Sequence, residues 1–182
     1  MSHTPTPGQT VGPFFHYALP YDGDRTLVTP GTPGAVELYG HVYDGDGAPV
    51  PDAIVELWQA DPDGRVAQRP GSLHRDGFTF TGWGRCATDA SGRYSFSTLR
   101  PGAVAGGLPF FAVAVFARGL LHRLLTRAYL PLADGDTDPL LTAAGGRAPT
   151  LVCVADGAGM RFDIRLQGDS ETVFLTTSGA PA

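Results

Sequence analysis

One charged residue, Arg118, lies in the otherwise apolar run LPFFAVAVFARGLL at residues 108–121. Burial of a guanidinium beside Phe116 and Leu120 is costly unless an anion meets it. A guanidinium binds a carboxylate through short, charge-assisted hydrogen bonds, often through two at once. The run therefore predicts an anionic partner for Arg118, either an acidic side chain of a protein or the carboxylate of a bound ligand.

The histidines and cysteines show no spacing typical of a metal site. The five histidines are His3, His16, His41, His74 and His122. His41 is interpreted as a hydrogen-bonded strand residue, His74 as a loop residue, and His122 as structural or interfacial. Cys86 and Cys153 are expected as reduced thiols rather than as a disulfide. With no glycine-rich phosphate loop and no nucleophile elbow, these residues alone indicate no catalytic chemistry.

The composition favours one soluble domain, because 182 residues suffice for a single core. The 13 basic and 18 acidic residues give a net charge of -5, which argues against nucleic acids and anionic membranes as main partners. The start MSHTPTPGQT resembles no signal peptide, and no apolar run reaches the roughly 18 residues of a membrane span. We therefore expect a cytoplasmic protein.

The 25 glycines and 16 prolines punctuate short apolar runs, a pattern typical of an all-β domain with tight turns. The alternation of residues 93–99 predicts a half-buried strand, and the continuous apolar run at 110–117 predicts a strand in the middle of a sandwich. The expected strands span residues 36–43, 53–59, 93–99, 110–117, 151–154, 161–166 and 173–177.

Other regions are less regular. Residues 78–86 are either strand or loop, residues 120–130 are a short helix or a strand, and residues 131–149 form a loop with at most a short helical turn. Residues 1–35, rich in Pro, Gly and Thr, are expected to form an extended arm rather than core. Residues 36–182 then form one antiparallel β-sandwich with long loops.

An ordered set of motifs resembles the intradiol ring-cleaving dioxygenases. YGHVYD at 39–44 and PDAIVELWQAD at 51–61 are similar to the core strands of that family. Residues 89–102 resemble its next hairpin, residues 161–168 and 171–174 its C-terminal strands, and TPGQTVGPF at 6–14 an N-terminal arm. The resemblance implies an antiparallel β-sandwich of the intradiol dioxygenase type with an extended arm. It also implies cleavage of an aromatic ring by O2 between two adjacent hydroxyl groups.

The resemblance further implies that this chain holds no iron. Members that bind non-haem Fe(III) use two tyrosines and two histidines, because hard anionic donors such as phenolates stabilise the ferric state. The matching positions in this sequence are Val66, Val104, Phe110 and Ala112. The Fe(III) of the complex is therefore expected on a homologous partner chain.

By the same resemblance, five residues bind substrate and none is catalytic. Arg118 matches an arginine near the carboxylate of a dihydroxybenzoate, where it would orient the ring toward the partner's iron and O2. Thr10, Gly12, Pro13 and Phe14 match arm residues that line the substrate mouth and pack on the partner. The family often has Tyr at the position of Phe14, so a hydroxyl-mediated contact is not expected there. Paired chains of this kind are expected to form a higher-order oligomer.

Two alternatives stay open. In one alternative, Arg118 pairs with an internal Asp or Glu or with the partner chain. The chain would then be a structural subunit that touches no substrate. In the other alternative the chain is a degenerate β-sandwich that serves as a binding module, since fold does not fix function.

Overall fold

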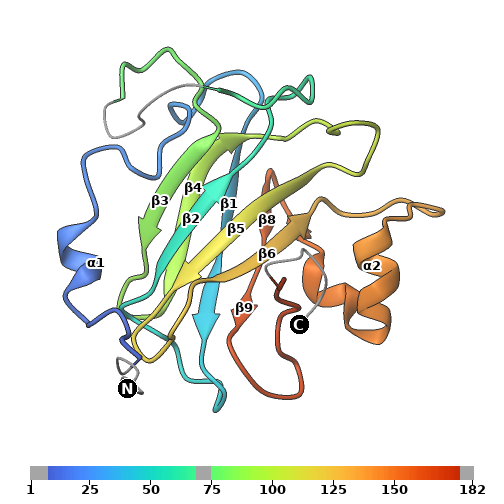
Figure 1. Ribbon diagram of the computed structural model, residues 1–182. Coiled ribbons are helices and arrows are strands. Elements are labelled where there is room, and N and C mark those ends of the chain that lie inside the picture. Colours follow the sequence, from blue (N-terminus) through green and yellow to red (C-terminus); the bar gives the residue numbers. More distant parts are fainter. Residues whose placement is uncertain (1–7, 69–74, 177–182) are drawn as a thin grey trace, which may run out of the picture.

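The computed structural model describes residues 8–68 and 75–176, and it shows two β-sheets packed on each other (Figure 1). One sheet has the order β4 (Arg93–Leu99), β1 (Ala35–Tyr43), β8 (Gly159–Arg161) and β7 (Val154–Asp156), and β9 (Ile164–Arg165) also pairs with β1. The other has the order β3 (Trp83–Ala87), β2 (Ile54–Trp58), β5 (Phe110–Phe116) and β6 (Leu124–Tyr129). The predicted all-β sandwich is confirmed.

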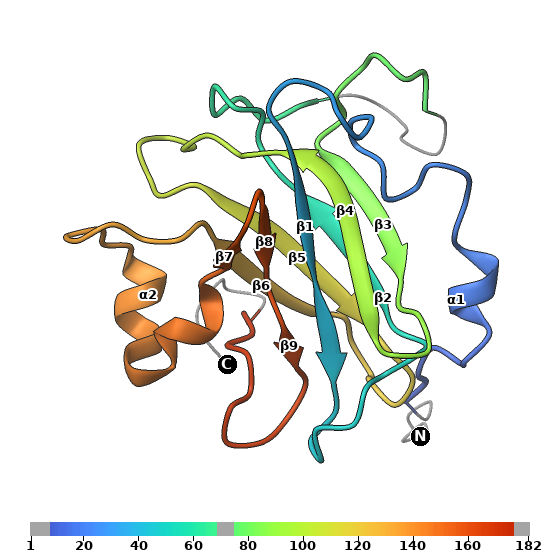
Figure 2. The same cartoon turned by 180° about the vertical axis from the view of Figure 1, so that it is seen from behind.

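Helices lie at the two edges of the sandwich. The short helix α1 (Phe15–Ala18) lies beside β3, whereas α2 (Pro139–Ala144) and a 3-10 segment (Gly145–Leu151) lie beyond β6 (Figure 2). No helix in the described ranges is long and apolar enough to cross a membrane.

Alternating side chains of β1 and β4 form one wall of the core. The inward positions of β4 are Tyr94, Phe96 and Thr98, and each is at most 1% exposed. Gly40 of β1 permits a close approach of the chain after β8, because a Cβ there would lie 1.9 Å from the carbonyl oxygen of Phe162. The Tyr94 hydroxyl donates a hydrogen bond to that same oxygen. A glycine therefore fixes how closely the C-terminal segment packs against β1.

Strands β2 and β5 form the other wall, and both cysteines lie in the core between the walls. Cys86 and Cys153 are buried free thiols, which confirms the prediction of reduced cysteines. Burial raises the pKa of both thiols, that of Cys153 to about 12. Neither thiol is therefore ionised or reactive at neutral pH.

The sandwich is not wholly antiparallel, which corrects the sequence-based expectation. β1 pairs in parallel with β8 through Leu38 and Met160, and with β9 through Val42 and Ile164. A parallel pair needs a long crossover connection. Here the connection runs through the whole second sheet, and a pattern of strand spacing does not reveal such a pairing.

Several predicted boundaries change in the structure. Residues 78–82 are loop and β3 begins at Trp83, while the open region 120–130 contains a strand, β6, rather than a helix. The predicted strand at 151–154 begins only at Val154, and the one at 161–166 is split between β8 and β9. No sheet strand forms over residues 173–176, where Leu175 only donates its N–H to the carbonyl oxygen of Leu125. The expected helical turn in 131–149 is confirmed by α2.

Part of the N-terminal segment belongs to this chain's own core, contrary to the prediction for residues 1–35. Leu27 is 5% exposed and packs in the main hydrophobic cluster. The N–H of Leu27 donates to the carbonyl oxygen of Ser97 on β4 at 2.9 Å, and the N–H of Ser97 donates to that of Arg25 at 3.0 Å. An apolar Leu–Val pair at 27–28 thus acts as a short strap along β4, although the surrounding Pro and Gly mask it in the sequence.

Candidate functional site

Arg118 lies in a tight turn that follows the central strand β5. Ala117 is 1% exposed, and its carbonyl oxygen accepts a hydrogen bond from the N–H of Leu120 at 3.2 Å. Gly119 takes a φ of +87°, which L side chains rarely adopt. A positive φ at the third position is typical of a type II turn. The turn carries Arg118 away from the core, so its side chain is 60% exposed.

The anion that meets Arg118 in this structure is a side chain of the same chain. Nε of Arg118 lies 2.9 Å from Oδ2 of Asp52, whose side chain is only 6% exposed. The predicted anionic partner is therefore an acidic side chain in this structure, and the guanidinium is not buried beside Phe116 and Leu120, because β5 ends at Phe116 and Arg118 lies in the turn that follows. Among the described residues, Arg118 forms no ion pair with any residue other than Asp52, and Nη1 and Nη2 donate no hydrogen bond.

Two hollows flank the 117–120 turn. A hollow of about 310 Å³ is lined by Arg118 and Gly119 together with residues 44–45, 49–51 and 166–167. A second hollow, of about 410 Å³, is lined by residues 9–11 of the arm and by Phe116, Ala117 and residues 120–123. Thr10 therefore lies across the turn from the Arg118 hollow. His122, interpreted as structural or interfacial, is exposed and lines the second hollow.

The other predicted arm residues lead into α1 and line neither hollow. Phe15 donates its N–H to the carbonyl oxygen of Gly12 at 3.3 Å. The ring nitrogen Nδ1 of His16 contacts the carbonyl oxygen of Pro13. Phe14 is 77% exposed. A Cβ added to Gly12 would meet nothing within 4 Å, so this chain alone does not require glycine there. The structure does not bring these three residues to Arg118.

Two arginines that sequence reasoning missed fasten the base of the arm to the sheet. Arg85 donates from Nε and Nη2 to Oε1 of Glu56 at 3.0 and 2.6 Å, and from Nη1 to the carbonyl oxygen of Leu19 at 3.1 Å. Arg75 donates from Nη2 to the carbonyl oxygens of Asp24 at 3.0 Å and Trp83 at 2.7 Å. No motif marks either arginine, because each acts through main-chain oxygens distant in sequence.

Tyr21 and Asp24 at the base of the arm are partly buried. Tyr21 stacks on Trp83 with ring centroids 6.2 Å apart. Burial raises the pKa of the Tyr21 phenol and that of the Asp24 carboxyl above their ordinary values. The arm is therefore held firmly at residues 19–28 and projects from there toward residues 8–14.

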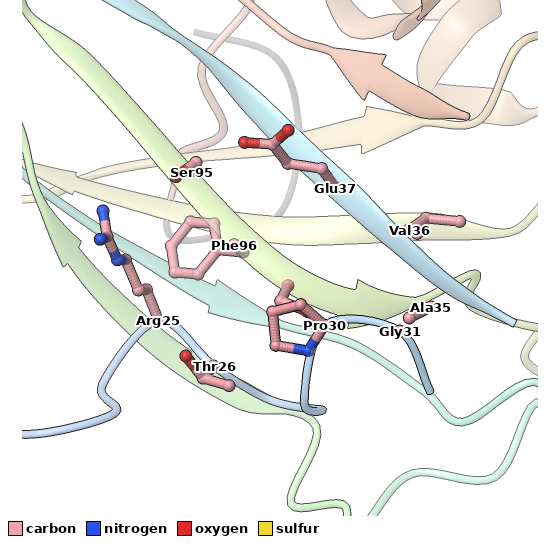
Figure 3. Close-up of a pocket in the computed structure, with 10 residues that line it drawn as sticks. Arg25, Thr26, Pro30, Gly31, Ala35, Val36, Glu37, Ser95 and Phe96 are labelled. Atoms are coloured by element: carbon pink, nitrogen blue, oxygen red, sulfur yellow. The ribbon is translucent and has the colours of Figure 1, made fainter. Parts of the chain in front are cut away.

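A further hollow of about 430 Å³ lies where the arm runs along β4 and β1 (Figure 3). Figure 3 shows Arg25 and Thr26 of the arm opposite Glu37 of β1 and Ser95 of β4. None of the substrate-binding residues predicted from the sequence lines it. We therefore interpret its polar side chains as part of the contact between the arm and the sheet, not as part of the substrate site.

The positions that match the family's iron ligands do not fit a metal ion. Val66 is 61% exposed, and Phe110 and Ala112 line a shallow hollow of about 530 Å³ on the outer face of the second sheet. The guanidinium of Arg127 lies 4.2 Å from the centroid of the Phe110 ring. Val104, like the other three, offers no donor atom in its side chain. Within residues 8–68 and 75–176, no group of three or more His, Cys, Asp or Glu residues could hold a metal ion.

The remaining histidines do not add a metal site among the described residues. His41 lies on β1, and its main-chain N–H donates to Oδ1 of Asp163 at 3.1 Å, while its Nδ1 lies 3.7 Å from the same oxygen. The predicted hydrogen bond of this strand residue is therefore made by its main chain. His3 and His74 lie outside the described residues.

Comparisons with known proteins agree with the resemblance. Residues 10–107 match a family described as Dioxygenase. The chain is 38% identical to the protocatechuate 3,4-dioxygenase alpha chain of Burkholderia cepacia, over 93% of this chain and 96% of that protein. It is 36% identical to the beta chain of that enzyme from the same organism, over 68% of this chain and 54% of that protein.

A solved structure gives the same result for the fold. The dioxygenase domain of a dioxygenase–carbohydrate-binding protein fusion from Streptomyces sp. SirexAA-E matches with a TM-score of 0.57 and 27% identity, and the match covers 91% of this chain and 99% of that one.

Proposed function

The chain belongs to the intradiol dioxygenase family, and we propose that it is the alpha subunit of a protocatechuate 3,4-dioxygenase. Its similarity to an alpha chain over almost the full length of both proteins carries this proposal. With a beta subunit it would cleave 3,4-dihydroxybenzoate by O2 to 3-carboxy-cis,cis-muconate. We expect the isolated chain to be inactive.

The Fe(III) belongs to the beta subunit in this proposal. Its support is the apolar character of Val66, Val104, Phe110 and Ala112, none of which can donate an electron pair to a ferric ion. A related beta chain exists in an organism that also has a related alpha chain.

The contribution of this chain is to hold the substrate. The substrate carries a carboxylate opposite its reacting hydroxyl groups, and a guanidinium is the group best suited to fix a carboxylate in one orientation. Nη1 and Nη2 of Arg118 would bind that carboxylate beside the 310 Å³ hollow. Thr10, Gly12, Pro13 and Phe14 would complete the mouth against the beta subunit.

Co-expression with the beta subunit tests the proposal. Iron and oxygen uptake dependent on 3,4-dihydroxybenzoate should be present only when both chains are purified together. Arg118→Ala should raise KM for this substrate by at least tenfold, since loss of one partner of a desolvated charge pair costs about 2–5 kcal/mol. Iron content should not change. Inhibition by catechol, which lacks the carboxylate, should also stay unchanged.

One observation favours the structural alternative: Asp52 already neutralises Arg118 within this chain. If the complex is active and Arg118→Ala leaves KM unchanged, the chain is a structural subunit that does not contact the carboxylate. If the chain purifies without a partner, iron or activity, the binding-module alternative replaces the proposal.

A further inference from the structure

Asp52 offers one carboxylate oxygen to Arg118 and leaves the other without a partner. Oδ2 contacts Nε of Arg118, whereas Oδ1 is buried and accepts no hydrogen bond in the described part of the chain. A buried carboxylate is stabilised best when both oxygens are satisfied. A buried carboxylate with one unsatisfied oxygen is therefore not the arrangement that would stabilise the fold best.

The contact leaves one edge of the guanidinium available. A guanidinium has five N–H donors in a rigid plane, and its terminal nitrogens Nη1 and Nη2 form an edge that matches both oxygens of a carboxylate. Asp52 approaches at Nε instead. The ion pair is shortest at the inner nitrogen of the guanidinium, and the Arg118 side chain as a whole is 60% exposed.

Both ends of the ion pair lie on constrained backbone. Asp52 directly precedes Ala53, whose N–H donates to Oγ1 of Thr88 at 3.0 Å, and the Thr88 hydroxyl in turn donates to the carbonyl oxygen of Val50 at 2.8 Å. On the other side, the tight turn described above fixes Arg118. A shift of the main chain at Asp52 or at Arg118 would disturb these hydrogen bonds.

We propose that Asp52 is the positioning residue that holds the guanidinium of Arg118 in the plane required to bind the substrate carboxylate. This inference rests on the proposed function of Arg118. A guanidinium already held at Nε loses less conformational freedom when the substrate binds. Asp52 thus acts on substrate affinity through Arg118, without touching the substrate.

A double-mutant cycle in the assembled alpha–beta enzyme tests the proposal. Asp52→Asn, Arg118→Ala and the double variant are compared for KM and kcat with 3,4-dihydroxybenzoate. Asp52→Asn should raise KM about tenfold with kcat within about twofold, a size typical of contacting residues that are coupled. In the Arg118→Ala background the same substitution should add no further change. Inhibition by catechol should stay the same, which a general structural defect would not allow.

Asp63→Asn is the matched control, because it removes the carboxylate of another Asp–Arg pair, at 2.7 Å from Arg65, in an exposed turn. It should change neither parameter. If Arg118→Ala raises KM and Asp52→Asn does not, the positioning role is overturned while the proposed function stands. An additional effect of Asp52→Asn in the Arg118→Ala background also overturns it.

If Arg118→Ala itself leaves KM unchanged, the proposed role of Arg118 fails first. Asp52→Ala replaces the Asn variant if the latter does not assemble. Failure of both to assemble overturns the positioning role, because Asp52 is then required by the fold.

Discussion

The 117–120 turn and the arm at residues 8–19 both carry predicted substrate-binding residues, but the fold secures them differently. Arg118 stands at the end of a central strand and is tied to a buried carboxylate. In the arm, Phe14 is 77% and Tyr17 75% exposed, and α1 contributes no buried residue. In the turn, Arg118 has an ionic partner within this chain. In the arm, aromatic side chains stay exposed because no other part of this chain covers them.

The difference shows which side chains this chain positions by itself and which are left exposed to a partner. The arm is held at its base by Arg85 and Arg75, and residues 9–11 at its other end lie beside the 117–120 turn. Between these two places the exposed rings of Phe14 and Tyr17 suit packing against a second protein. The comparison predicts that substitutions near the base affect this chain alone, whereas those near the tip affect only the complex.

The largest expected effect on stability is that of Arg85→Ala. Its ion pair with Glu56 is nearly buried, with side chains 15% and 16% exposed. Loss of one partner leaves Glu56 unpaired and should cost about 3 kcal/mol in the free energy of unfolding. Urea denaturation of the chain measures this cost, and amide hydrogen exchange should rise at residues 15–19.

Arg65→Ala is the control for that prediction. The pair of Arg65 with Asp63 is 76% and 68% exposed, so its loss should cost less than about 0.5 kcal/mol. Equal costs for the two variants would mean that Arg85 does not anchor the arm.

Sequence and structure agree best where local pattern decides the outcome. The alternation of RYSFSTL follows the burial of β4 residue by residue, because one side of that strand faces the core. The parallel pairing of β1 with β8 was missed, since it depends on a connection of more than 100 residues rather than on either strand. Local pattern singled out Arg118 as a charge in an apolar run and residues 1–35 as an arm, but only the family resemblance suggested that they bind substrate.

The partner of Arg118 was left open for a physical reason. An aspartate after Pro51, just before a strand, is typical of turn geometry, and nothing nearby marks Asp52 as the acidic residue that meets a strand end 66 positions later. The strap at Leu27 escaped prediction in the same way, because it is joined to Ser97 on a distant strand, with which the neighbouring Thr26 forms an isolated β-bridge.

Arg118→Ala should also destabilise the isolated chain, by about 1–2 kcal/mol. The variant leaves the buried Asp52 carboxylate without its cation, although the exposure of Arg118 lets water replace part of the interaction. Adding Asp52→Asn removes the unpaired charge and should restore part of the loss in urea denaturation. A double variant less stable than Arg118→Ala would show that Asp52 is stabilised by other groups.

Phe14→Ala should leave the isolated chain as stable as before, because its ring is 77% exposed. If the arm packs on the beta subunit, the same variant should weaken assembly by about 1 kcal/mol, as expected for an aromatic contact outside a binding hot spot. Urea denaturation measures the stability of the isolated chain, and sedimentation at several concentrations measures assembly. Phe78→Ala, at a side chain 96% exposed in another loop, is the control. Destabilisation of the isolated chain by Phe14→Ala would place the arm tip in this chain's own core.

The smallest effect is expected at Asp76, next to the anchor Arg75. The hydroxyl of Thr79 and the N–H groups of Thr79 and Phe78 donate to the Asp76 carboxylate, and they lower its pKa to about 2. A folded-state pKa below the unfolded value contributes stability that is present above about pH 4 and is lost as the pH falls toward 2.

Asp76→Asn should therefore be less stable than the wild type at pH 6, and the difference should shrink markedly by pH 2, where about half of the Asp76 carboxyl groups are protonated. Denaturation at the two pH values checks this. A difference as large at pH 2 as at pH 6 would mean that the loop holding Arg75 depends on the shape of the Asp76 side chain rather than on its charge.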